Sequence, residues 1–454
     1  MAGILELDGD GGRPPTPRCV PFLPPNVPGL TDAWRPAGRC CASFRAGLGL
    51  SIAWLTLLAP GPGLAAPPRI ATGLDVVLAE APAAWGGKRL GLLTHDAARA
   101  GDGRTAAEAL VHLGKGKVVR LFAPEHGLGA RAQGRGEAGR DPRTGLPCVT
   151  LDGATVQTVR QHLLPLDGLV VDIQDVGVRH YTYEMLVWRV VEAAGQARRP
   201  VWVLDRPTPV PGPAQGAWPV GGEGRLGGPP VPLCHGLTLG ELALLAAAGM
   251  AAPPQLVVVP VQGWAGQPAY GRGGLAWHAP SPALRTPSDA LRYGGLGLFE
   301  ATNVACRWPG RAFAWFGAPW ADGGAVARVA AAARLPGVAF RPEVHGGSGG
   351  VVVEVVDEAR YLPIETGLAV LAAFARHHPQ RFRFSARMMA ALSGSNEVSE
   401  MLQGDRDWRR LASAWRLAGR RFEAEVLAVR LYGRGRSPRG TFPPSGRSAT
   451  LGTP

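Results

Sequence analysis

Two short segments concentrate side chains that can perform acid–base chemistry. The first, 124–127, has the sequence Pro-Glu-His-Gly and sets a carboxylate beside an imidazole in a tight turn. The second, 172–183, contains two carboxylates, a guanidinium and two phenols, on Asp172, Asp175, Arg179, Tyr181 and Tyr183. General acid–base reactions need carboxyl or imidazole groups held in reach of a reacting bond. We therefore predict that these segments contribute to one site.

Each segment also has a structural interpretation. Glu125 could accept backbone N–H groups, and His126 could bond to a carbonyl. Asp175 with Arg179 could be an ion pair that only stabilises the fold. A cluster of this size is nevertheless costly to hold for stability alone, which favours a functional interpretation of 172–183.

The elements that position these residues alternate between strands and helices. Apolar runs typical of strands occur at 89–93, 118–122, 169–171 and 201–204, with a fifth at 256–261. Helical spacing of apolar residues occurs at 106–113, 155–163, 183–197 and 239–248. This order predicts βαβ units and a parallel sheet. The carboxyl ends of such strands share one edge, where we expect Glu125, Asp172, Asp175, Asp205 and Arg206 to converge.

The predicted fold class is α/β, with a Rossmann-like parallel-sheet domain followed by a smaller α+β C-terminal domain. In the latter we expect strands at 351–356 and 426–432 and helices at 367–376 and 408–418. The predicted divisions are an N-terminal extension with signal peptide at 1–66, a catalytic domain at 67–287, the α+β domain at 288–432 and a tail at 433–454. Neither a GxGxxG nor a GxxxxGK[ST] sequence follows a strand, so we expect no nucleotide cofactor.

Charge gives little support for nucleic-acid binding. The 454 residues carry a formal net charge of +13, but Lys occurs only at 88, 115 and 117, and no long basic block is present. Arg, Ala, Gly and Pro are enriched along the whole chain, which indicates a compositional bias rather than a stripe that follows phosphates. Arginine does suit carboxylates, so a small anionic substrate could use a few of these residues.

The N-terminal region has the three parts of a secretory signal. Arg35, Arg39 and Arg45 precede an apolar run at 46–58, and small residues follow at 61–66. The apolar run is shorter than the roughly 20 residues that span a bilayer. We therefore expect export to the periplasm or the extracellular space, without stable membrane insertion after cleavage.

Cysteine usage is consistent with this location but does not define a site. Cleavage would leave Cys148, Cys234 and Cys306, an odd number without CxxC spacing. We expect all three to be small buried side chains.

Seven segments in fixed order resemble the exo-acting β-N-acetylmuramidases of bacteria. They are 121–127, 144–147, 172–183, 204–207, 235–242, 298–303 and 316–320. The resemblance covers roughly residues 70–432. It implies a glycoside hydrolase that removes N-acetylmuramic acid from the non-reducing end of peptidoglycan fragments during cell-wall turnover or recycling. Its expected partners are muramyl saccharides, whose lactyl carboxylate would explain arginines in the cleft.

The resemblance also implies roles for individual residues. Glycoside hydrolysis needs a proton donor and a second group that attacks the sugar, activates water or orients the substrate's acetamido group. We assign Glu125 as general acid/base, His126 as the residue that orients or tunes it, and Asp175 in preference to Asp172 as the second group. Substrate positioning is assigned to Asp172, Arg179, Tyr183, Asp205, Arg206, His235 and Asn303. Glu241 has capping-box spacing from Thr238 and could simply begin a helix.

The sequence departs from the pattern of that family at a few positions. His95 replaces an Asn, Asp152 replaces a Tyr, and Ser281-Pro282-Ala283 lacks an Asn after Ser-Pro. The loop before Val351 is shortened. These changes concern the sugar and the glycan length that are preferred, and leave the expected fold intact.

Two other function classes remain as alternatives. A wall-sugar binding protein would keep the arginines and aromatic residues without needing a titrating Glu125. A metal-dependent hydrolase, such as a deacetylase, could use His126, His235 and an Asp, but no HxxxH or HxH spacing supports it. We expect neither a metal nor a cofactor.

Overall fold

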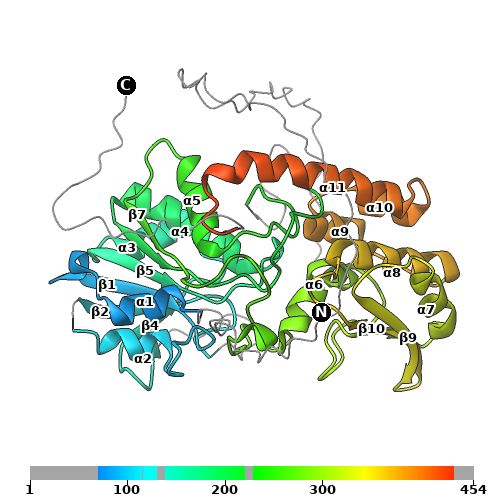
Figure 1. Cartoon of the computed structure of the whole chain (residues 1–454), viewed down its shortest axis with the longest axis horizontal. Helices are drawn as coiled ribbons and strands as arrows, with labels where there is room; N and C mark the ends of the chain where they lie inside the picture. Colours follow the sequence, from blue (N-terminus) through cyan, green and yellow to red (C-terminus); the bar gives the residue numbers. More distant parts are fainter. Residues whose placement is uncertain (1–69, 115, 130–138, 220–228, 434–454) are drawn as a thin grey trace, which may run out of the picture. The chain divides into compact units, whose positions relative to one another are not determined.

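The described part of the chain contains two sheets of different type (Figure 1). The computed structural model describes residues 70–114, 116–129, 139–219 and 229–433. The signal segment expected within 1–66 and the tail expected at 433–454 fall almost entirely outside these ranges. Within the ranges, no helix is both long and apolar enough to span a membrane.

The first sheet has seven strands in the order β3-β4-β2-β1-β5-β6-β7. Their bounds are β1 Arg89–Thr94, β2 Lys117–Ala123, β3 Gly139–Arg140, β4 Pro147–Thr150, β5 Gly168–Asp172, β6 Val201–Leu204 and β7 Leu256–Val259. All pairs are parallel except β3 with β4. In the centre, Leu92 is paired with Leu121 on one side and Val170 on the other. The predicted parallel sheet is therefore confirmed.

Helices cover both faces of this sheet. They are α1 Gly73–Ala79, α2 Ala106–Val111, α3 Val156–Leu163, α4 Thr182–Ala197 and α5 Leu239–Ala248. Side chains of β1 alternate between the faces: Leu92 packs in the cluster with α1 and α2, while Leu93 packs in the cluster with α3, α4 and α5. Because both faces are buried, the central strands are almost continuously apolar.

The second sheet is antiparallel, in the order β8-β10-β9, and belongs to a mixed region. Its strands are β8 Trp315–Ala318, β9 Val338–His345 and β10 Ser348–Val355. The associated helices are α6 Pro287–Leu296, η3 Gly297–Ala301, α7 Gly323–Ala331, α8 Pro363–His377, α9 Ala386–Ser393, α10 Glu397–Gln403 and α11 Trp408–Glu425. The smaller α+β part of the predicted fold is thus confirmed, whereas the domain boundaries themselves stay predictions.

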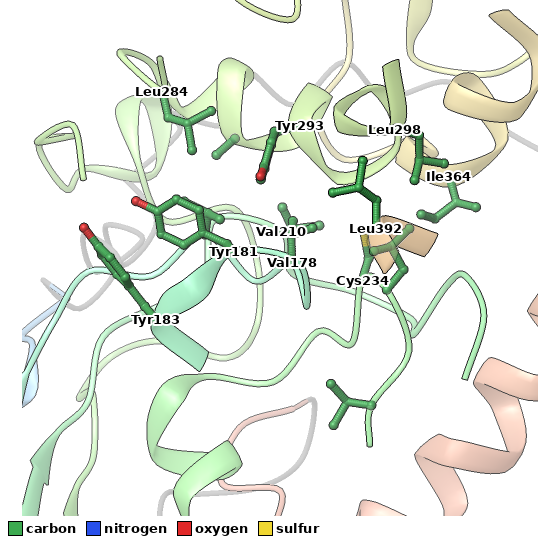
Figure 2. Close-up of a cluster of buried hydrophobic side chains, with 14 of the residues drawn as sticks. Val178, Tyr181, Tyr183, Val210, Cys234, Leu284, Tyr293, Leu298, Ile364 and Leu392 are labelled. Atoms are coloured by element: carbon green, nitrogen blue, oxygen red, sulfur yellow. The ribbon is translucent and has the colours of Figure 1, made fainter. Parts of the chain in front are cut away.

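One hydrophobic core joins the two regions. Figure 2 shows Val178 and Cys234, from loops at the edge of the parallel sheet, close to Leu298, Ile364 and Leu392 from the second region. All three cysteines among the described residues are buried and free. Loops at the sheet edge are therefore held rigidly by the residues that follow α6.

The prediction of a strand at 426–432 is wrong. The segment begins with a 3-10 turn, η4 Val426–Ala428, and then runs without strand pairing. Its backbone N–H groups at Leu431 and Tyr432 donate instead to Glu241 Oε1, at 2.7 and 3.3 Å. A side chain thus replaces the neighbouring strand that the apolar pattern led us to expect.

Candidate active site

The turn after β2 carries Glu125. The Gly127 N–H donates to the Pro124 carbonyl at 3.1 Å, closing the turn. His126 and Gly127 have φ values of 72° and 71°. A left-handed conformation is unusual for a residue other than Gly, and such strain is commonly found at functional sites. The predicted tight turn is present, with His126 as its strained member.

Glu125 lies half-buried beside the start of α4. The Thr182 hydroxyl donates to Glu125 Oε2 at 2.7 Å, and the Tyr183 hydroxyl donates to the Glu125 carbonyl at 3.1 Å. Tyr183 is fully buried, and its hydroxyl also lies 2.9 Å from the Pro280 carbonyl. The start of α4 therefore fixes both the backbone and one carboxylate oxygen of Glu125.

His95 follows β1 and lies close to this turn. Its Nε2 accepts the Gln174 N–H at 2.9 Å, and its ring packs edge-on against Tyr183. Burial, followed by the charges of Arg206 and His126, lowers the pKa of His95 to about 3. His95 is therefore a neutral acceptor near His126. An Asn at this position would offer a carbonyl oxygen for the same bond.

Asp175 lies in a buried acid network with Glu184 and His235. Leu237 N–H donates to His235 Nδ1 at 3.0 Å, so Nε2 carries the proton that His235 donates to Glu184 Oε1 at 2.6 Å. Burial lowers the pKa of His235 to about 4, so the ring is neutral. Asp175 Oδ2 accepts the Gly177 N–H at 2.6 Å.

The remaining oxygen of each of these carboxyl groups, on Asp175 and on Glu184, lacks a hydrogen-bond donor within the described part of the chain. Asp175 Oδ1 and Glu184 Oε2 are buried, and among the described residues neither has a donor partner. Burial, then the charge of Glu184, raises the pKa of Asp175 well above its usual range, and burial raises the pKa of Glu184 to about 8. Hydrogen bonding to Asp175 opposes part of the shift on Glu184. At neutral pH the raised pKa of Glu184 therefore favours its protonated form, next to Asp175, whose pKa is also raised.

This network predicts a change in stability with pH. Since folding raises the pKa of Glu184 from 4.5 to about 8, the folded protein retains a proton that the unfolded chain has lost. The resulting stabilisation is complete below pH 4.5 and is lost as the pH rises through 8. Above pH 6.5, where the histidines no longer contribute, unfolding in urea should show wild type losing up to about 1.4 kcal/mol per pH unit more than Glu184→Gln.

In Glu184→Gln, the amide can still accept from His235 and can donate to Asp175, so the fold is expected to be retained. Parallel stability curves for the two proteins between pH 6.5 and 8.5 would contradict the raised pKa of Glu184.

Asp172 and Arg206 bind each other. Arg206 Nε and Nη2 donate to the two Asp172 oxygens at 2.5 and 2.9 Å, and Nη1 donates to the Arg99 carbonyl at 3.0 Å. Both side chains are buried. Burial raises the pKa of Asp172, and Arg206 opposes that shift. The predicted convergence of these residues at the sheet edge is observed, as a closed ion pair behind the Glu125 turn.

Asp205 connects the sheet edge to the end of the described chain. Its Oδ1 accepts the N–H groups of Arg206 and Gly240, and its Oδ2 accepts the hydroxyls of Thr238 and Tyr432 at 2.6 and 2.7 Å. Burial raises the pKa of Asp205 to about 6. All of its acceptor capacity toward neighbouring groups is thus used inside the protein. Glu241 forms the expected capping box with Thr238.

The side chains of Arg179 and Asn303 form hydrogen bonds with backbone groups of the second region. Arg179 Nη2 donates to the Leu392 carbonyl at 3.2 Å, near the end of α9. Asn303 accepts the Arg383 N–H and donates to the Arg381 carbonyl, both at 2.9 Å. The substrate-positioning roles assigned to both residues stay predictions.

The described residues form two cavities whose lining residues interact with Glu125 or with the residues that follow it. The first, here the Glu300 cavity, has a volume of about 480 Å³ and is lined by Phe299, Glu300, Thr302, Val304, Ala305, Cys306, Arg307 and Trp308. Arg307 forms an ion pair with Glu300. Burial raises the pKa of Glu300, Arg307 opposes the shift, and the charge of Glu125 adds to it. Glu300 and Glu125 are therefore close enough to interact.

The second cavity, here the arginine cavity, has a volume of about 390 Å³. It is lined by Asp96, Ala97, Arg99, Gly129, Trp277, His278, Ala279, Ser281, Pro282 and Arg285. It adjoins the Glu125 turn through two contacts. Asp96 N–H donates to the Leu128 carbonyl at 2.7 Å, and Tyr183 bridges the carbonyls of Glu125 and Pro280.

Sequence reasoning identified Glu125 but missed several residues around it. Thr182 holds the carboxylate, Glu184 completes the acid network, and Glu300 lines a cavity. Thr182 and Glu300 each lie inside a segment that resembled the family, so both had a sequence signal, whereas Glu184 lies directly after such a segment. The described residues contain no group of three or more His, Cys, Asp or Glu side chains that could hold a metal ion.

The sequence matches a known protein family over most of the described residues. Residues 90–288 match the family model for the N-terminal part of exo-β-N-acetylmuramidase NamZ, and residues 291–432 match its C-terminal part. The peptidoglycan β-N-acetylmuramidase NamZ of Bacillus subtilis (strain 168) is 32% identical over an alignment of 336 residues that covers 70% of this chain and 80% of that protein.

Two crystal structures of DUF1343 family proteins from Bacteroides fragilis NCTC 9343 have a similar fold. One has a TM-score of 0.73 at 29% identity and the other 0.58 at 24%, each covering 80% of this chain and 99% of the other chain. The matched regions span both sheets and every residue of the site described above. The chain belongs to the exo-β-N-acetylmuramidase NamZ family.

Proposed function

We propose that this protein hydrolyses the glycosidic bond of N-acetylmuramic acid at the non-reducing end of peptidoglycan fragments. The observation that carries the proposal is the position of Glu125, which is half-buried on a strained turn and interacts electrostatically with Glu300 in the wall of a cavity. Family membership gives the reaction class. The muramyl saccharide as the specific substrate is our inference from this site.

Glu125 acts as the general acid that protonates the leaving oxygen. Thr182 holds Oε2, so Oε1 is the oxygen that reaches the glycosidic bond. A positioned acid of this kind typically contributes 10²- to 10⁴-fold to the rate. In the second half of the reaction the same carboxylate accepts the proton of the attacking water if the mechanism proceeds through an intermediate. His126 adjoins it on the turn and sets its orientation.

Two carboxyl groups are candidates for the second role. Asp175, which the sequence favoured, is 7% exposed and bound to Gly177 and Glu184. Glu300 lines a cavity and interacts with Glu125. We expect Glu300→Gln to lower kcat about 100-fold or more, the range for a group in the transition state. Asp175→Asn should lower kcat only as far as it lowers the folded fraction.

The measurement is kcat on a chromogenic muramoside, normalised to folded protein by circular dichroism. If Asp175→Asn lowers the normalised kcat more than Glu300→Gln does, Asp175 and not Glu300 is the second catalytic carboxyl group.

Export to the periplasm or the extracellular space is part of the proposal. It is supported by the arrangement of basic, apolar and small residues before residue 67. N-terminal sequencing of the mature protein from cells tests it. A mature protein that begins before residue 60 contradicts it.

The activity itself is tested with the purified protein on a chromogenic muramoside and on a MurNAc-GlcNAc disaccharide. Release of free N-acetylmuramic acid from both, unaffected by EDTA, is the expected result. Loss of activity with EDTA would support a metal-dependent hydrolase instead. Tight sugar binding without release would support a binding protein.

A further inference from the structure

The arginine cavity has a positive electrostatic character. Arg99 and Arg285 line it, and Arg206 lies nearby. The acidic residue in its wall, Asp96, is ion-paired with Arg143. Among the described residues, no carboxylate forms an ion pair with Arg99 or Arg285. The cavity therefore has more positive than negative charge in its walls.

The pKa of His278 reflects this positive charge. It lines the cavity, and its pKa is lowered first by burial and then by the charges of Arg99 and Arg206. No carboxylate contributes to the shift. Protonation of the ring is thus disfavoured by two neighbouring cations, and an anion in the cavity would be attracted by the same charges.

Two side chains in the walls of the cavity, those of Arg99 and Trp277, are held in place by hydrogen bonds. Arg99 Nη1 donates to the Gly103 carbonyl at 2.8 Å, and its own carbonyl accepts from Arg206. The indole N–H of Trp277 donates to the Leu284 carbonyl at 3.1 Å, which sets the plane of this half-buried ring. An aromatic ring beside a guanidinium offers an apolar face to a sugar ring and a planar fork to a carboxylate.

We infer that the arginine cavity binds the carboxylate of an acidic amino sugar at the non-reducing end of the substrate, with Arg285 as its principal partner. The inference rests on the proposed function, because N-acetylmuramic acid carries such a carboxylate on its lactyl ether, whereas N-acetylglucosamine carries none. The volume of about 390 Å³ lies within the range for small-ligand sites. Its position beside the Glu125 turn places the recognised sugar next to the general acid.

The test compares two substrates that differ only in charge. A chromogenic muramoside and its lactyl methyl ester are assayed with wild type, Arg285→Gln, Arg285→Lys and Arg420→Gln. Arg420 is an exposed residue on α11 outside both cavities, so its replacement is a control for the same change in net charge.

Wild type is expected to prefer the acid over the ester. Loss of a charge-assisted hydrogen bond should lower that preference about 10- to 100-fold in Arg285→Gln, mainly through KM. Arg285→Lys should recover part of it, because a point charge replaces the bidentate fork. Arg420→Gln should leave the preference unchanged. A preference that is the same in wild type and Arg285→Gln would overturn the inference.

Failure of the proposed function gives a different result. If wild type releases the chromophore from neither substrate, the activity is absent. Calorimetric binding of N-acetylmuramic acid and of its methyl ester then tests the cavity alone. Tighter binding of the acid that is lost in Arg285→Gln supports the inference without activity. Equal binding of the two sugars contradicts it.

Discussion

Glu125→Gln is expected to lower kcat on a chromogenic muramoside by about 10²- to 10⁴-fold. The amide keeps the size of the side chain and can still accept the Thr182 hydroxyl, so the turn is expected to remain in place. It cannot donate a proton to the leaving oxygen. Because the ground-state contacts of the sugar are kept, KM should change little and binding of N-acetylmuramic acid should persist.

A matched control is Glu354→Gln, which makes the same change on the exposed surface of β10. It should retain the activity of wild type. If Glu125→Gln keeps wild-type kcat, Glu125 is not the acid. If it loses sugar binding together with activity, Glu125 is a binding residue and the assignment of its role is wrong.

Arg206→Gln is expected to lower the free energy of unfolding by about 3–5 kcal/mol. The change removes the guanidinium that binds both oxygens of Asp172, whose side chain is fully buried. A buried carboxylate without its partner costs far more than the net value of the pair. Total stability is typically about 5–15 kcal/mol, so a loss of this size would remove a large share of it.

Urea unfolding at neutral pH measures this effect. Arg104→Gln is the control, since Arg104 pairs with Asp102 on the exposed surface and its loss should be barely measurable. The double variant Asp172→Leu/Arg206→Met should recover most of the stability, because it removes both buried charges. Equal stability of Arg206→Gln and wild type would show that the pair does not support the sheet edge.

The parallel sheet could be predicted because each of its strands is recognisable from a short stretch of sequence. Strands β1, β2, β5 and β6 are buried on both faces, so each reads as a short apolar run, and polar residues mark where it ends. Helix α5 was predicted with its full length because a capping box precedes its apolar face. The segment after α11 was mispredicted because its backbone partner, Glu241, lies about 190 residues earlier in the chain.

The candidate site was predicted only in part. The sheet edge brings Glu125, Asp172, Asp175 and Asp205 into one neighbourhood, as strand order requires. Sequence could not show which of them would reach a cavity. That depends on how deeply the fold buries each side chain: Asp172 and Asp175 are buried, whereas Glu125 is half-buried. The raised pKa values of Asp175 and Glu184 likewise arise because burial removes water from both carboxyl groups.

The contacts of Asp205 determine how the second region can move. That region leaves the sheet part just before α6, and its far end returns to the sheet edge, where Tyr432 bonds to Asp205 and Leu431 to Glu241. A segment attached at one end can swing on a hinge, whereas one attached at both ends can only rotate about the line through its attachments. The region that carries Glu300 is therefore restrained at both of its ends, and peptides fused after residue 433 start from an anchored chain end.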